Sequence, residues 1–124
     1  MKINIKATGI ELTGAISNYL ESKLTALRKL VGPAEAEVVA SIELGKETKH
    51  HKHGEVFRSE INLIAHGENF YAVALAEDLY AAIDKMKDEI IGEVKSRRKK
   101  KNTLLRRGGR LLKNMFRKFY GQSE

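Results

Sequence analysis

The sequence predicts an α+β domain whose four strands and two helices follow the order β-α-β-β-β-α. Two periodicities in the sequence predict this fold. Four segments alternate polar and apolar residues, as strands do, and two segments repeat apolar residues every three or four positions, as helices do. We expect a four-stranded, mostly antiparallel sheet with both helices on one face, since these elements can then share a single core. A length of 124 residues fits one such domain, followed by a basic tail that is helical or disordered.

Residues 2–7 read Lys-Ile-Asn-Ile-Lys-Ala, an unbroken alternation that predicts a strand with one buried face. Apolar residues at helical spacing then predict an amphipathic helix, formed around Ile16, Leu20, Leu24, Leu27 and Val31. Thr13 can cap the start of this helix, and Gly32-Pro33 can end it.

Alternation returns in the middle of the chain and predicts three further strands. Ala36–Leu44 forms the second strand, the polar stretch Gly45–Gly54 a loop, and Phe57–Ala65 the third strand. Gly67-Glu68-Asn69 predicts a turn into a fourth strand, Phe70–Leu75. The pattern leaves open which face of this last strand is buried.

Asp78 can cap a second helix. Its apolar stripe consists of Leu79, Ile83, Met86, Ile90 and Val94. The next positions of the same stripe are Arg97 and Lys101, which a sheet cannot cover. The core-facing part of the helix is therefore expected to end at Val94.

Beyond this helix we expect a tail. Gly108-Gly109 interrupts the helical pattern, and Arg110–Tyr120 resumes it as a basic amphipathic segment. We divide the chain into a domain of residues 1–101 and a tail of residues 102–124. Much of residues 96–124 is expected to be disordered in the free protein, because so charged a segment buries little apolar surface.

The net charge of +7 is unevenly distributed along the chain. Residues 1–94 carry 11 Lys and Arg against 15 Asp and Glu, whereas residues 95–124 carry 12 against Glu124 alone. The run Lys95–Lys101 holds six cations in seven residues, which repel one another unless salt or a polyanion neutralises them. The basic end therefore predicts a polyanionic partner such as RNA, and we favour this over a merely solubilising tail.

The predicted RNA-binding residues lie on the second helix and its basic continuation. Lys85, Lys95 and Lys99 fall opposite the apolar stripe, where phosphate can approach them, although an ordinary solvated helix face is the alternative. The full predicted set is Lys85, Lys95, Arg97, Arg98, Lys99, Lys100, Lys101, Arg106, Arg107 and Arg110. Secondary candidates on the first helix are Lys23, Arg28 and Lys29.

The segment Arg110–Tyr120 has three interpretations. It could lie on RNA, dock onto a protein through Leu112, Phe116 and Phe119, or bind an anionic membrane surface. We rank the three interpretations in that order because the positive charge of this segment continues the cationic run of residues 95–101. For the function of the whole chain, the first alternative is a general double-stranded RNA-binding protein. The second, which we rank lower, is a membrane-surface protein.

The block Asp78-Leu79-Tyr80-Ala81-Ala82-Ile83-Asp84 resembles the ribosome hibernation promoting factor family, the ribosome-associated translation inhibitors. Leu12-Thr13 followed by Ala15-Ile16, the alternating first strand and a histidine-bearing loop also match, and the resemblance covers Met1–Lys101. It implies a β-α-β-β-β-α domain in the small-subunit channel used by messenger RNA and by A-site and P-site tRNA. Occupancy there blocks translation and protects idle ribosomes. The family usually spreads basic residues over both helices, whereas the first helix here has few.

Other classes of function are disfavoured. The chain has no cysteine, which excludes disulfides and thiolate chemistry, and no nucleotide-binding or catalytic motif is present, so we expect neither an enzyme, a cofactor nor a small-molecule substrate. His50, His51 and His53 lie among lysines that oppose a metal ion, and His66 offers only one further imidazole, so we predict no metal site. Without a membrane span or secretory segment, we expect a cytoplasmic protein that is monomeric when free.

Overall fold

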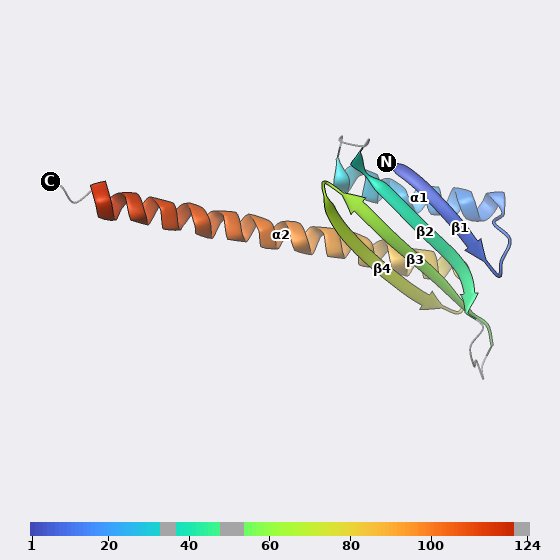
Figure 1. Cartoon of the computed structure of the whole chain (residues 1–124). Helices are drawn as coiled ribbons and strands as arrows, with labels where there is room; N and C mark the ends of the chain where they lie inside the picture. Colours follow the sequence, from blue (N-terminus) through green and yellow to red (C-terminus); the bar gives the residue numbers. More distant parts are fainter. Residues whose placement is uncertain (33–36, 48–53, 121–124) are drawn as a thin grey trace. The chain divides into compact units, whose positions relative to one another are not determined.

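The predicted order of elements is confirmed by the computed structural model, which describes residues 1–32, 37–47 and 54–120 (Figure 1). The elements are β1 Lys2–Thr8, α1 Gly14–Val31, β2 Val39–Glu47, β3 Val56–Ala65, β4 Glu68–Ala76 and α2 Leu79–Tyr120. The chain divides into two compact units, residues 1–93, which we call the body, and residues 94–124. We call the described helical part of the second unit, residues 94–120, the basic arm.

The sheet has the strand order β1-β2-β3-β4 and is mostly antiparallel, as expected. The one parallel pair is β1 with β2, and its strands are joined through α1, because parallel strands require a crossover connection. Figure 1 shows α1 and the beginning of α2 on the same face of the sheet. The predicted arrangement of both helices on one sheet face is thus confirmed for the body.

The core of the body lies between this sheet face and the two helices. Side chains from α1, from strands β2, β3 and β4 and from α2 are almost fully buried there, among them Leu24, Ile42, Ile61, Ile83 and Met86. The structure also resolves the orientation of β4, since Phe70, Ala72 and Ala74 are each only 5% exposed, whereas Tyr71 and Leu75 are 49% exposed.

The turn between β3 and β4 is tighter than the sequence predicted. Ala65 pairs directly with Glu68, so the loop consists of His66 and Gly67 alone. Both have positive φ, 54° and 77°, as a two-residue type I′ turn requires. The prediction that Glu68 and Asn69 belong to the turn is wrong, because a histidine in the left-handed region takes one of the two turn positions.

Strand β2 differs from its prediction at both ends. It starts at Val39, and the predicted first residue, Ala36, lies outside the described residues. It continues through Gly45, where the sequence predicts the start of a loop, as far as Glu47. A Cβ at Gly45 would meet the Thr8 carbonyl oxygen at 2.8 Å, so glycine here serves the close approach of β1 rather than a turn.

Helix α2 runs without a break from Leu79 to Tyr120. The expected interruption at Gly108-Gly109 and the expected disorder are therefore wrong for residues 96–120. A glycine in a helix interior is less favourable than alanine by about 1 kcal/mol, which lowers helix stability without forbidding the conformation. The surrounding leucines, lysines and arginines are good helix formers.

The buried position of Ile83 gives a test of the core. Ile83→Ala should lower the free energy of unfolding by about 2–5 kcal/mol, because it removes a fully buried side chain and leaves a cavity. Urea denaturation of the full chain measures this. The matched change Ile64→Ala, on the outer sheet face where Ile64 is 47% exposed, should cost less than about 1 kcal/mol. Equal losses would contradict the assignment of the two sheet faces.

Candidate nucleic-acid interface

The basic arm carries nine of the ten residues predicted to contact RNA. All of these nine belong to α2, and all are exposed except Arg97, which is half-buried. Successive residues of an α-helix are rotated by about 100°, so the six cations of residues 95–101 point to every side of the helix. The arm therefore presents positive charge around its whole circumference at this level.

Part of this charge converges on one strip of the helix surface. Side chains one turn apart line a shallow hollow there: Lys95, Arg98, Lys99, Asn102, Thr103 and Arg106. The Thr103 hydroxyl donates a hydrogen bond of 2.9 Å to the Lys99 carbonyl within the helix. The hollow combines cations with the amide of Asn102, groups that donate hydrogen bonds to phosphate oxygens.

The arm is not uniformly polar. Leu104 and Leu105 are 65% and 68% exposed, and only Asn102 and Thr103 separate them from the cationic run. Lys100, Thr103, Leu104 and Arg107 contribute to a second hollow next to the first. The arm can thus offer apolar contact beside its charges.

The tenth predicted residue, Lys85, lies in the body on the exposed side of α2. Its sequence neighbourhood is acidic, with Asp84, Asp88 and Glu89 close by, and the adjacent Lys87 forms an ion pair of 2.7 Å with Asp88. Lys85 is thus separated along the chain from the cationic run and lies among carboxylates.

The secondary candidates on α1 fall into two groups. Lys23 lies 3.4 Å from a carboxylate oxygen of Asp84, and Arg28 donates to Glu21 at 2.8 Å, so a carboxylate offsets each of these charges. Lys29 is exposed in the last turn of α1. Of the three, Lys29 is the best placed to meet a phosphate.

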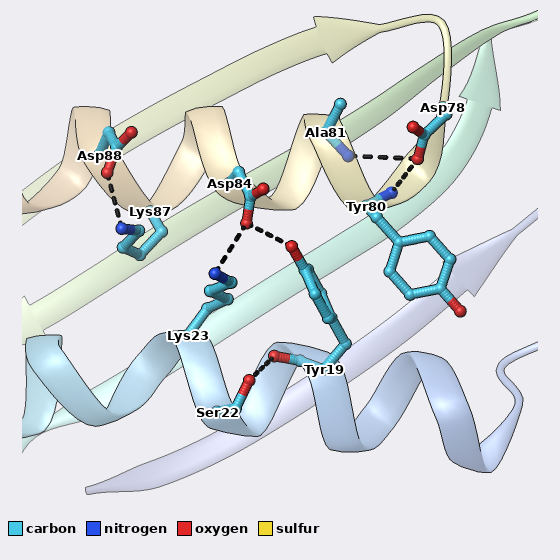
Figure 2. Close-up of polar contacts among 9 residues, drawn as sticks. All are labelled: Tyr19, Ser22, Lys23, Asp78, Tyr80, Ala81, Asp84, Lys87 and Asp88. Atoms are coloured by element: carbon cyan, nitrogen blue, oxygen red, sulfur yellow. Dashed lines mark hydrogen bonds and ion pairs between the residues drawn. The ribbon is translucent and has the colours of Figure 1, made fainter.

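A cluster between α1 and α2 was missed by sequence reasoning. Figure 2 shows Tyr19 and Lys23 of α1 pointing toward Asp84 of α2, while Tyr80 lies beside Tyr19. The Tyr19 hydroxyl donates a hydrogen bond of 2.7 Å to the same Asp84 oxygen that pairs with Lys23. The rings of Tyr19 and Tyr80 meet edge to face, with centroids 4.8 Å apart and planes at 89°. The signal in the sequence is two i, i+4 pairs, one on each helix.

The cluster changes the acidity of its members. The hydrogen bond to Asp84, and then burial, raise the pKa of Tyr19 above its ordinary value. The negative charge of Asp84 raises the pKa of Lys23. The start of α2 is fixed independently, because the Asp78 carboxylate accepts hydrogen bonds from the backbone amides of Tyr80 and Ala81, as predicted for a cap.

The outer face of the sheet carries the other exposed aromatic residue of the body, Tyr71. Arg58 and Glu60 form an ion pair of 2.8 Å on the neighbouring strand. Burial, and then a hydrogen bond with Glu60, raise the pKa of Tyr71. This face mixes both charge signs with Ile64 and Leu75, so it has no cationic surface comparable to the arm.

The histidine-rich segment with His50, His51 and His53 lies outside the described residues. His66 has a structural contact, since its ring Nε2–H donates a hydrogen bond of 2.8 Å to the Val31 carbonyl at the end of α1. Within residues 1–32, 37–47 and 54–120, no cluster of three or more potential metal ligands occurs. No helix in that part of the chain has the length and apolarity needed to cross a membrane.

Comparison with known proteins agrees with the fold. Residues 3–102 match the family described as sigma 54 modulation protein / S30EA ribosomal protein. The N-terminal domain of Protein Y from Thermus thermophilus is similar with 30% identity and a TM-score of 0.63, over 77% of this chain and 98% of that domain. A ribosomal subunit interface protein from Coxiella burnetii shares the fold with 18% identity and a TM-score of 0.62, over 79% and 98% of the two chains. No curated protein matches the sequence.

The cluster predicts a specific pH dependence. The folded-state pKa values of Tyr19 and Lys23 are raised, so the stability that Asp84 provides should be complete below about pH 10 and should be lost as the pH rises through those values. Asp84→Asn should therefore be less stable than the wild type near neutral pH, with a difference that narrows above about pH 10. Urea denaturation across this pH range measures the difference.

A spectroscopic control assigns the effect to the cluster. Tyrosine absorbance followed against pH should show one phenol titrating earlier in Asp84→Asn than in the wild type, and Tyr19→Phe should abolish that difference. A stability difference that stayed constant up to about pH 12 would contradict the cluster as its source.

Proposed function

The chain belongs to the family of sigma 54 modulation and S30EA ribosomal proteins, and from this premise we propose that it is a ribosome hibernation factor. It binds the small ribosomal subunit in the channel for messenger RNA and for A-site and P-site tRNA, and it inhibits translation by occupying that channel. Likeness to a ribosomal subunit interface protein and to Protein Y supports the proposal. The cytoplasm, where ribosomes work, is then its expected location.

The observation that carries the proposal is the distribution of charge around the basic arm. A helix lying on one flat surface needs cations on one side only, whereas residues 95–101 present them on all sides. Such a segment is best neutralised where phosphates approach from several directions, as they do in a channel with RNA walls. The proposed phosphate contacts are the ten residues of α2 that the sequence predicts to bind RNA.

The body has a different part in this mechanism. Residues 1–93 carry 11 Lys and Arg against 15 Asp and Glu, so charge alone would repel this unit from RNA. Its contribution is volume and shape, which exclude messenger RNA and tRNA while the arm provides attraction. The mechanism needs no bond-making step and no cofactor.

One competition experiment separates this proposal from its alternatives. Labelled protein is offered small ribosomal subunits, duplex RNA and anionic vesicles at equal phosphate concentration. Preference for the subunits supports the proposal. Equal binding to isolated duplexes would instead indicate a general double-stranded RNA-binding protein, and preference for vesicles would indicate a membrane-surface protein acting through Arg110–Tyr120.

Neutralising two arm lysines tests the phosphate contacts. Lys99→Gln/Lys100→Gln should weaken binding to small subunits and reduce the slope of log affinity against log salt by about 1.5, since two contacts are lost. The unfolding transition should not change, because both side chains are exposed. The control Lys2→Gln/Lys6→Gln removes two exposed lysines from β1 and should leave the slope unaltered. An equal change in both variants would refute a specific role for the arm.

Truncation tests the division of labour. A chain ending after Val94 should keep a cooperative unfolding transition, because the predicted core stripe ends there, yet it should lose at least about tenfold in affinity for small subunits. A chain ending after Arg110 keeps every proposed phosphate contact and should bind much like the full chain. If the loss appeared only when residues 111–124 were removed, the attraction would lie in the amphipathic end rather than in the cationic run.

A further inference from the structure

The acidic body needs a means of binding RNA that does not rely on charge. Among its cations, Lys23, Arg28, Lys46, Arg58 and Lys87 are each paired with a carboxylate. A phosphate approaching these cations would have to compete with the carboxylate that each already contacts. Contacts to bases, which are uncharged, do not face this competition.

The aromatic pair Tyr19 and Tyr80 is the feature of the helix side best suited to such a contact. Tyr80 is 40% exposed in the first turn of α2, where the Asp78 cap holds its backbone. Tyr19 packs against it edge to face, and the hydrogen bond to Asp84 fixes Tyr19 in turn. The exposed ring thus rests on a support tied to both helices (Figure 2).

We propose that Tyr80, supported by Tyr19, stacks against an unpaired base of the ribosomal RNA. Every base has a π-face that can stack on an aromatic side chain, and single-stranded RNA exposes such faces where a duplex does not. Lys23 and Asp84 form an ion pair beside the supporting Tyr19 ring, and the Asp78 carboxylate accepts hydrogen bonds from the amides of Tyr80 and Ala81, so these three charged groups already have partners. A ring whose position is already fixed loses little conformational freedom on binding.

This inference rests on the proposed function, since it names the chemistry by which the body meets the same RNA. The stacking contact differs from the phosphate contacts of the arm in its dependence on salt. Phosphate contacts release counterions, so their strength falls as salt rises, whereas stacking on a neutral ring releases none. The arm and Tyr80 therefore contribute to affinity in ways that a salt series separates.

The test compares Tyr80→Leu with the full-length wild type on small ribosomal subunits over a salt series. Tyr80→Leu should weaken binding by about tenfold at every salt concentration, with an unchanged slope, because one stacked base is lost. Tyr80→Phe keeps the ring and should bind like the wild type. Tyr71→Leu removes a tyrosine of similar exposure, 49%, from the opposite sheet face and serves as the matched control. Chemical probing should show one rRNA base that the wild type protects and Tyr80→Leu does not.

Each result of these binding measurements either supports or overturns the stacking contact. An unchanged affinity in Tyr80→Leu, an equal loss in Tyr71→Leu, or a lowered salt slope would overturn the stacking contact. Urea denaturation of the variants identifies any loss that comes from unfolding, and a folded Tyr80→Phe that binds as weakly as Tyr80→Leu would also overturn it. Binding to single-stranded poly(U) measures the ratio of the wild-type affinity to the Tyr80→Leu affinity without ribosomes. If the wild type failed to bind small subunits, the proposed function would fall, while the poly(U) ratio would still decide the stacking.

Discussion

Burial of one sheet face against the apolar stripes of α1 and α2 is the interaction on which the rest of the molecule depends. The stripe of α2 supplies Leu79, Ile83, Met86 and Ile90 to this core. Its next positions are Arg97 and Lys101, and a charged side chain cannot take the place of an apolar one against a sheet without a large desolvation cost. The same helix therefore serves as a core element in its first part and as a carrier of charge in its second. The boundary between the body and the basic arm follows from this change of side chains.

The charge of the two units follows the same boundary. Five cations of the body, Lys23, Arg28, Lys46, Arg58 and Lys87, are paired with its own carboxylates, whereas the arm crowds six cations into residues 95–101, where like charges repel one another. In the proposed function, charge therefore attracts the arm to RNA and repels the body from it. Because phosphate contacts position a protein without reading sequence, the arm can provide strength but little discrimination among RNAs.

Local periodicity predicted most of the fold, because burial of one face imposes a period of two on strands and about 3.6 on helices. The errors have physical causes. His66 adopts a left-handed conformation that a histidine does not signal, and Gly45 is required by the nearby Thr8 backbone, a contact invisible to local patterns. Among the candidate site residues, the cationic run could be predicted from the sequence, because it consists of consecutive Lys and Arg residues. The cluster around Asp84 was not visible, because Tyr19 of α1 and Asp84 of α2 are 65 residues apart along the chain and meet only when the two helices share a sheet face.

In the proposed function, discrimination between ribosomes and other RNAs would come from the body, through its shape and uncharged contacts. A stacked base adds directionality, since a ring accepts a base only in a parallel orientation and only where the RNA is unpaired. The hydrogen bond between Tyr19 and Asp84 fixes the ring that supports Tyr80, so under the proposed stacking Asp84 would affect which RNA fits without contacting the RNA itself. The family block at residues 78–84 thereby combines three tasks within two helical turns. Asp78 caps α2, Tyr80 offers an exposed ring, and Asp84 joins the two helices that hold it.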